Sequence, residues 1–129
     1  MDEGRALRVL VIEDARLMRL YYRGVLEKDG FRVEEALNGL EGLEKALTQA
    51  PDLMVVDINM PKMDGLTFLA KLREGEGPEA STPVLMTSTE AKDSDKDAAR
   101  AAGANFYLVK PIAPDALLAH VRLLSGRRI

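Results

Sequence analysis

The 129-residue sequence contains no cysteine, which excludes disulfide bonds, thiolate nucleophiles and cysteine-ligated metals and is consistent with a reducing compartment. It also lacks any apolar run near the ~20 residues that a membrane-spanning helix needs. Its first residues, Met1-Asp2-Glu3-Gly4-Arg5, lack the pattern of a signal peptide. Positive charge is not in excess, because the formal net charge is -3, so there is no electrostatic reason to bind nucleic acid. We therefore expect a cytoplasmic protein with no membrane insertion and no direct contact with nucleic acid.

The composition is that of an ordinary globular protein, with 47% hydrophobic and 30% charged residues. A chain of 129 residues suits one domain and can bury roughly two-thirds of its unfolded surface. We find no internal repeat, linker or low-complexity segment. The sequence therefore predicts a single domain over residues 1–129, with a flexible loop at 75–82 and a short stub at 127–129.

Short apolar runs alternate with segments of helical periodicity five times along the chain. The predicted strands are 7–12, 31–36, 53–56, 83–86 and 105–109, and the predicted helices are 15–29, 38–50, 64–72, 94–103 and 114–124. Neighbouring parallel strands need crossover connections, so this alternation predicts an α/β doubly wound fold with a five-stranded parallel sheet and helices on both faces. The second strand carries Glu34 and Glu35, which favours a place at the edge of the sheet.

Several residues are typical of helix ends. Asn38 and Asp64 suit the N-caps of the second and third helices. Ser94 and Asp97 have the spacing of a capping box for the fourth helix. Pro114 suits the first turn of the last helix.

The central strand is the most informative stretch. Four apolar residues at 53–56 run directly into Asp57, and Pro61 and Gly65 then require a loop. A continuous apolar run of this length indicates a strand buried on both faces. Asp57 is therefore expected at the carboxyl end of a buried parallel strand, which is where ligands collect in open α/β sheets.

Polar side chains follow the other strands at the same edge. The residues that we expect to converge there are Glu13, Asp14, Asp57, Asn59, Ser88 and Lys110. Three neighbouring carboxylates repel one another unless a divalent cation lies between them, and Mg²⁺ is bound by few carboxylates together with carbonyls and water. A hydroxyl and an ammonium suit an anion with several oxygens. This set predicts a phosphoryl-transfer site with Asp57 as the nucleophile.

Four segments form an ordered pattern at the predicted strand ends: 11–14 (VIED), 56–65 (VDINMPKMDG), 83–88 (PVLMTS) and 109–111 (VKP). This pattern resembles that of bacterial response-regulator receiver domains, and is most similar to the single-domain, CheY-like chemotaxis type. The resemblance covers about residues 8–124. It implies a flavodoxin-like (βα)5 fold with strand order 2-1-3-4-5. Glu13 stands where the family more often has aspartate, and Ser88 where threonine is commoner.

The resemblance also implies roles for individual residues. Asp57 would accept a phosphoryl group from a sensor histidine kinase or phosphotransfer protein. The carboxylates of Glu13, Asp14 and Asp57 would bind Mg²⁺ together with the backbone carbonyl of Asn59. Lys110 would contact the phosphoryl group, and the Lys110–Pro111 peptide bond would be cis.

Further roles concern switching and signal lifetime. Ser88 would move to hydrogen-bond the phosphoryl group, and Tyr107 would then turn inward as the switch aromatic. Asn59 and Glu90 would flank the attacking water and tune dephosphorylation. The protein would then be a phosphoacceptor signalling domain and not an enzyme with an external substrate.

The fourth helix is expected to be the moving part. Its buried face would consist of Ala98, Ala99, Ala101 and Ala102, which bury little apolar area. We expect the face made by this helix, the fifth strand and the last helix to change on phosphorylation and to bind a downstream protein, plausibly in chemotaxis. We expect a monomer or weak dimer.

Other functions remain open at this stage. They are a nucleotide or flavin carrier on the same fold, a hydrolase with an aspartyl-phosphate intermediate, a docking module that works without phosphorylation, and a receiver domain cut from a larger regulator. Some residues also have simpler explanations: Asp14 could cap the first helix, Tyr107 could serve packing alone, and His120 is expected at the surface and not as a ligand.

Overall fold

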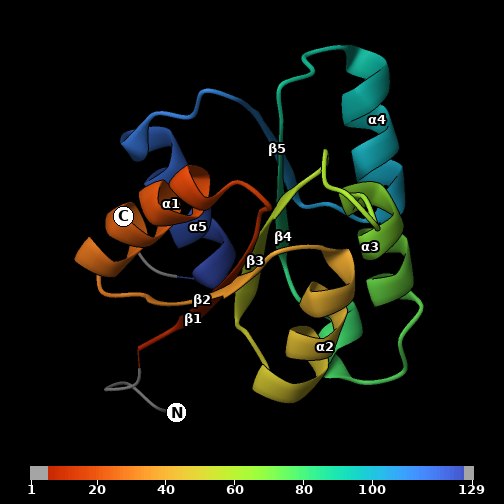
Figure 1. Cartoon of the computed structure of the whole chain (residues 1–129), viewed down its shortest axis with the longest axis horizontal. Coiled ribbons are helices and arrows are strands. Elements are labelled where there is room, and N and C mark those ends of the chain that lie inside the picture. The colour runs from red at the N-terminus through yellow and green to blue at the C-terminus, as the bar shows by residue number, and fades with distance from the viewer. Residues whose placement is uncertain (1–5, 127–129) are drawn as a thin grey trace.

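The structure in Figure 1 is a computed structural model, and it describes residues 6–126. The strands are β1 (Arg8–Ile12), β2 (Arg32–Ala36), β3 (Leu53–Asp57), β4 (Val84–Ser88) and β5 (Phe106–Val109). The helices are α1 (Arg16–Lys28), α2 (Gly39–Gln49), α3 (Gly65–Arg73), α4 (Asp93–Ala102) and α5 (Pro114–Ser125), with a short 3-10 turn, η1 (Pro78–Ser81). Every predicted strand and helix is present.

The strands form one parallel sheet in the order β2-β1-β3-β4-β5. This confirms the doubly wound, flavodoxin-like fold and places β2 at an edge, as its two glutamates predicted. The helices α1 and α5 cover one face of the sheet, and α2, α3 and α4 cover the other (Figure 1). The central strand β3 is buried along its whole length, so Asp57 ends a strand that is enclosed by both helical layers.

Side chains alternate between the two faces and form two apolar cores, as the two-residue period of a strand requires. On the α1/α5 face the core includes Val55, Leu85 and Tyr22. On the other face it includes Val56, Met86 and Phe68. Burial of apolar side chains on both faces stabilises the sheet and holds the strand ends at one edge.

Most predicted helix ends are confirmed. The Asn38 side chain accepts a hydrogen bond from the Glu41 N–H at 2.9 Å, and Asp64 accepts one from the Thr67 N–H at 2.8 Å. Pro114 lies in the first turn of α5. These caps satisfy N–H groups that have no partner inside the helix.

The capping box predicted for α4 is wrong. The helix begins at Asp93, so Ser94 lies inside the first turn, and Lys92 occupies the N-cap without a side-chain hydrogen bond. Asp93 and Asp95 instead place negative charge near the positive end of the helix dipole.

The predicted buried face of α4 is also wrong in part. Ala99 is buried and Ala102 is half-buried, whereas Ala98 and Ala101 are exposed. A helix turns by about 100° per residue, so two residues beyond Ala99 the chain faces away from the sheet. The contact of α4 with the sheet is therefore even smaller than the sequence predicted.

The segment predicted as a flexible loop at 75–82 contains η1 and is held from one side. Arg73 donates hydrogen bonds to the carbonyls of Ala80 and Thr82 at 3.0 and 2.7 Å, and to that of Gly103 at 2.8 Å.

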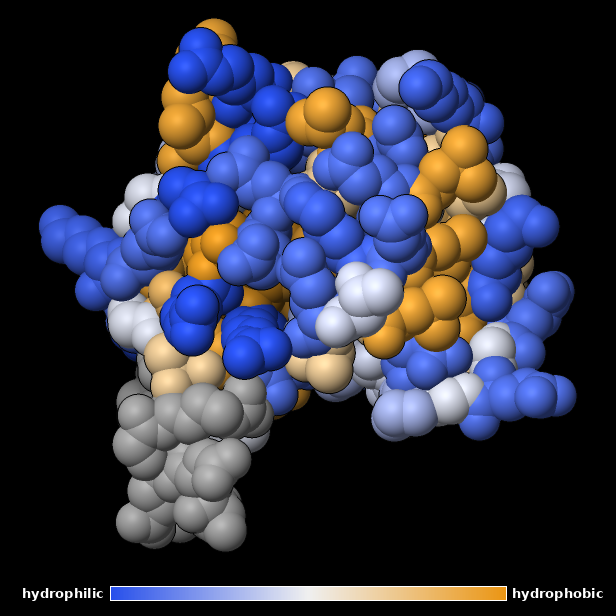
Figure 2. All heavy atoms as spheres, turned by 60° about the horizontal axis from the view of Figure 1, so that its bottom comes forward, coloured by the Kyte–Doolittle hydropathy of each residue, from blue (hydrophilic) through white to orange (hydrophobic). Residues whose placement is uncertain are grey.

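Within residues 6–126, no helix is long and apolar enough to cross a bilayer. The stub predicted at 127–129 lies outside the described residues. The face at the bottom of Figure 1 is mostly hydrophilic, with apolar residues in separate clusters (Figure 2).

Candidate functional site

Three carboxylates gather at the carboxyl edge of the sheet. Glu13 and Asp14 follow β1, and Asp57 ends the adjacent strand β3. One oxygen from each of the three lies within 4.8 Å of the others. Glu13 and Asp57 are buried, with 1% and 4% of their area exposed, whereas Asp14 is exposed to solvent. The sequence therefore predicted correctly which acids meet.

Lys110 supplies the positive charge of the site. Its Nζ lies 2.8 Å from Glu13 Oε1 and 3.1 Å from Asp57 Oδ1. Burial alone would lower the pKa of Lys110, but its hydrogen bonds to these two carboxylates outweigh burial and raise the pKa. The Lys110 ammonium thus stays charged because both carboxylates face it, and the predicted meeting of Lys110 with Asp57 is present.

Glu13 is the most constrained of the acids. Burial raises the pKa of Glu13, against the lowering effect of the hydrogen bonds from Lys110 and from the Ala15 N–H. The second bond runs from the Ala15 N–H to Oε2 at 3.1 Å, so the carboxylate is held at the start of α1. The longer side chain of glutamate therefore places its two oxygens on two different donors.

The acid set fits a hard divalent cation. Carboxylate oxygens are the ligands that Mg²⁺ accepts, and three carboxylates within 4.8 Å carry more negative charge than the single Lys110 ammonium balances. Glu13, Asp14 and Asp57 are the residues that would hold it. Asn59 lies in the exposed loop after β3, and the use of its carbonyl as a further ligand stays a prediction.

Ser88, Glu90 and Tyr107 form a chain of hydrogen bonds beside this cluster. The buried Ser88 Oγ accepts a bond from the Glu90 N–H at 3.0 Å. The Tyr107 hydroxyl donates to the Glu90 carbonyl at 2.6 Å. Ser88 lies one residue beyond Thr87, the β4 partner of Asp57, so it is at the same carboxyl edge of the sheet as Asp57. The switch roles of Ser88 and Tyr107 stay predictions, as does the effect of Glu90 on dephosphorylation.

Two further features of the site surroundings were expected in part. The Lys110–Pro111 peptide bond is cis, as the resemblance implied. Asp14 does not cap α1, because the N-cap is Ala15 and makes no side-chain hydrogen bond. His120 is half-buried and not simply at the surface, since its ring packs edge-on against Phe106 at a centroid distance of 4.8 Å.

Sequence reasoning missed Arg19, which holds the loop that carries the acids. Its guanidinium donates to the backbone carbonyls of Glu13 and Asp14, both at 2.9 Å, and to the Glu35 side chain at 2.8 Å. The only sequence signal for this role of Arg19 was its position, one turn into a helix that follows two acidic residues. Arg19 therefore orients the backbone of the candidate metal ligands from behind.

Gly65 was expected only to break the chain into a loop, yet it has a closer role. A Cβ at this position would lie 2.5 Å from the Asp57 carbonyl oxygen and 2.8 Å from the Ile58 Cα. The start of α3 can approach the end of β3 only because residue 65 has no side chain.

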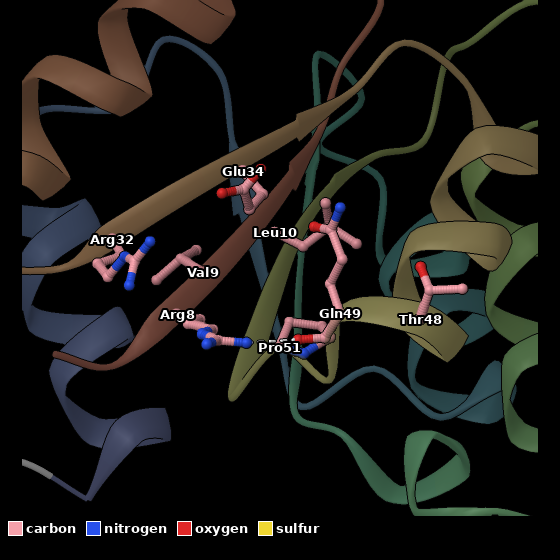
Figure 3. A pocket seen from close by; sticks show the side chains of 8 residues that line it. All are labelled: Arg8, Val9, Leu10, Arg32, Glu34, Thr48, Gln49 and Pro51. Atoms are coloured by element: carbon pink, nitrogen blue, oxygen red, sulfur yellow. Dashed lines mark hydrogen bonds between the residues drawn. The ribbon is translucent and has the colours of Figure 1, made fainter. Parts of the chain in front are cut away.

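A separate hollow of about 240 Å³ lies away from this site, near the amino-terminal ends of β1 and β2 (Figure 3). Arg8, Arg32 and Gln49 are among the residues that line it. It contains none of the residues of the acidic cluster and takes no part in the chemistry described above.

The chain is similar to known proteins along nearly its whole length. The sequence profile of the response regulator receiver domain matches residues 9–122. The KDP operon transcriptional regulatory protein KdpE of Escherichia coli (strain K12) is 40% identical over 119 residues, which cover 92% of this chain and 51% of KdpE. Chemotaxis protein CheY of Bacillus subtilis (strain 168) is 38% identical over 114 residues, which cover 88% of this chain and 92% of CheY.

Solved structures agree with the sequence matches. Chemotaxis protein CheY4 of Vibrio cholerae has a TM-score of 0.87 and 33% sequence identity, and the match covers 93% of this chain and 99% of CheY4. The chain spans about half the length of curated relatives such as KdpE, and nearly all of the length of CheY. Because the profile match extends over most of the sequence, the protein belongs to the response regulator receiver domain family of two-component systems.

Proposed function

We propose that Asp57 accepts a phosphoryl group, in a reaction that depends on Mg²⁺, from a phosphohistidine on a sensor histidine kinase or phosphotransfer protein. One observation carries the proposal: the Lys110 ammonium lies 3.1 Å from Asp57 Oδ1, inside a cluster of three carboxylates. The positive charge is already next to the carboxylate that would be phosphorylated, so little rearrangement is needed to balance the charge of the product.

The transfer itself is a displacement at phosphorus. An Asp57 carboxylate oxygen attacks, the bond from phosphorus to the histidine nitrogen breaks, and its electron pair leaves with the imidazole. The product carries roughly one more negative charge than the free carboxylate. Lys110 can follow this charge by shifting its ammonium from Glu13 toward the phosphoryl oxygens. A metal held by Glu13, Asp14 and Asp57 would supply further neutralisation of the phosphoryl oxygens.

Intact-mass measurement tests the proposal directly. Incubation with acetyl phosphate and Mg²⁺ should add the mass of one phosphoryl group. The mass should not increase in Asp57→Asn, or in the wild-type protein when the metal is chelated. In this scheme the protein turns over no external substrate beyond its own phosphorylation and dephosphorylation. An unchanged mass of the wild-type protein, with a known receiver domain phosphorylated in parallel, would refute the proposal.

We further propose that the signal leaves through the face formed by α4, β5 and α5. The Ser88–Glu90–Tyr107 chain joins the end of β4 to β5, and α4 buries a single alanine, so this part of the molecule is weakly held. Phosphorylation then shifts a balance between two conformations that differ at this face. The partner there is a downstream protein, and the protein acts in the cytoplasm as a monomer or weak dimer.

The pathway is the remaining choice. A chemotaxis role is supported by similarity to CheY over nearly the full length of both chains. A role as the receiver part of a transcriptional regulator is supported by similarity to KdpE, of which the chain matches about half. Affinity capture with the beryllofluoride-bound protein, using Asp57→Asn as the control bait, separates the two by the identity of the retained partner.

A further inference from the structure

Two buried hydroxyl groups lie beside the phosphorylation site and near each other, and neither makes a hydrogen bond of normal length to any group among residues 6–126. Tyr22 of α1 and Thr87 of β4 are both fully buried. Their Oη and Oγ1 atoms have no hydrogen-bond partner in the described part of the chain. An unpaired buried hydroxyl lowers stability, and phenylalanine and valine would fill nearly the same space without that cost.

The strand register places Thr87 beside Asp57. Thr87 pairs with Asp57 on β3 and with Leu108 on β5. Paired residues of neighbouring parallel strands point to the same face of the sheet, so the Thr87 and Asp57 side chains stand next to each other. Lys110 starts two residues beyond Leu108, and its side chain crosses β4 to reach Asp57 Oδ1 at 3.1 Å. The Thr87 hydroxyl therefore lies on the strand that the Lys110 side chain spans.

Tyr22 reaches the same place from the helix above. Burial raises the pKa of Tyr22, while the nearby Thr87 hydroxyl and the charge of Lys110 act in the opposite direction. The carboxylates of Glu13 and Asp57 add to the increase in pKa. The phenol hydroxyl thus lies within the field of every charged group that is buried in the site.

We propose that Tyr22 and Thr87 are positioning residues of the phosphorylation site, an inference that rests on the phosphoacceptor function proposed above. A hydroxyl hydrogen rotates freely, so each oxygen can present either a lone pair or a hydrogen to its surroundings. Lys110 has three N–H groups, of which Glu13 and Asp57 take two, so the ammonium keeps one donor for a nearby oxygen. When negative charge is added at Asp57, the hydrogens turn toward it. The pair thereby favours the phosphorylated state at the expense of the stability of the resting fold.

Substitutions of matched shape test this inference. Tyr22→Phe and Thr87→Val should each weaken the binding of beryllofluoride in saturating Mg²⁺ by roughly 3- to 10-fold, the range of one hydrogen bond. Their free energy of unfolding without ligand should stay equal or rise, because an unpaired hydroxyl is removed. Thr87→Ser is the matched control, since it keeps the hydroxyl and loses a buried methyl group. It should bind beryllofluoride as the wild type does while unfolding more easily.

The two measurements separate positioning from packing. Wild-type affinity in Tyr22→Phe and Thr87→Val would overturn the inference, and so would a loss of affinity in all three variants that merely follows their loss of stability. A wild-type protein that binds no beryllofluoride would refute the phosphoacceptor function itself, and the inference with it. Affinity is measured by titration calorimetry, and stability by urea unfolding followed by circular dichroism.

Discussion

Lys110 lies closer to Glu13 than to Asp57, with Nζ 2.8 Å from Glu13 Oε1 and 3.1 Å from Asp57 Oδ1. One ammonium therefore serves two buried carboxylates, and the shorter contact is with Glu13, which would bind metal alone, and not with Asp57, which would also be phosphorylated. Binding of a metal by Glu13 would release Lys110 toward Asp57. This exchange links the two halves of the site through a single side chain.

The substitution Glu13→Gln should weaken Mg²⁺ binding by at least ~10-fold, because it removes one of three anionic ligands. Titration calorimetry measures the effect. Glu44→Gln, on the exposed surface of α2, is the control and should keep the wild-type affinity. Equal affinities for wild type and Glu13→Gln would exclude Glu13 from the metal site.

Mg²⁺ binding should also weaken as the pH falls, and this loss should begin at a higher pH than in a site built on an ordinary glutamate. Burial raises the pKa of Glu13, so the carboxylate takes up a proton early on acidification and the site loses a negative charge. The effect of pH on the stability of the fold has the opposite sign to its effect on Mg²⁺ affinity. With a raised pKa in the folded state, protonated Glu13 contributes stability at low pH, and this contribution is lost as the pH rises through the folded pKa. Both trends should disappear in Glu13→Gln, and a metal affinity with the same pH dependence in both proteins would contradict this account.

The Glu35 carboxylate on β2 should stabilise the fold only above the acid range. Burial would raise the pKa of Glu35, but hydrogen bonds from Arg23 and Arg19 outweigh it and lower the pKa. With a lowered folded-state pKa, the stability that Glu35 contributes is present above the unfolded pKa and is lost as the pH falls through the folded pKa. Glu35→Gln should therefore cost ~0.5–1 kcal/mol at neutral pH and nothing measurable in strong acid. Glu34→Gln, whose side chain makes no ion pair among the described residues, is the control in the same urea unfolding series.

The substitution Gly65→Ala should lower the free energy of unfolding by ~1–3 kcal/mol and slow phosphorylation by acetyl phosphate. The added Cβ would lie 2.5 Å from the Asp57 carbonyl oxygen, so the backbone that carries Asp57 must shift. Gly24→Ala is the matched control, because a Cβ there meets nothing within 4 Å and α1 should gain ~0.5–1 kcal/mol. A Gly65→Ala protein with wild-type stability would show that this approach of α3 to β3 is not needed.

Amide hydrogen exchange should change between residues 94 and 124 when beryllofluoride and Mg²⁺ bind, and should change little in β1 and β2. The reason is that α4 buries only Ala99, so the free energy needed to open it is small. Asp57→Asn treated in the same way is the control. Unchanged exchange over 94–124 in the wild type would move the signalling face elsewhere.

The convergence of Glu13, Asp57 and Lys110 could be predicted from the sequence because it depends on one rule. Residues that follow parallel strands meet at one edge of the sheet, whatever the details of packing. Short apolar runs identified the strands well, since a strand enclosed on both faces leaves little room for polar residues.

Other features could not be predicted because they depend on contacts between segments far apart in the chain. The role of Arg19 requires knowing how α1 leans over the acidic loop, and that of Gly65 requires the distance between α3 and β3. Ser94 had the right spacing for a cap, but helix starts can move by about two residues at little cost, and here the helix begins at Asp93 with Lys92 at the N-cap.

The peptide groups of residue 90 are shared between two strands, with the Glu90 N–H on Ser88 Oγ and the Glu90 carbonyl on the Tyr107 hydroxyl. A turn of the serine hydroxyl toward Asp57 would break the first of these hydrogen bonds and leave the second as the one that still holds Glu90. If Ser88 moves on phosphorylation, as the resemblance implies, Glu90 connects that movement to the aromatic ring of Tyr107 on β5. Glu90, in the loop before α4, is thus the residue through which the end of β4 is joined to the Tyr107 side chain.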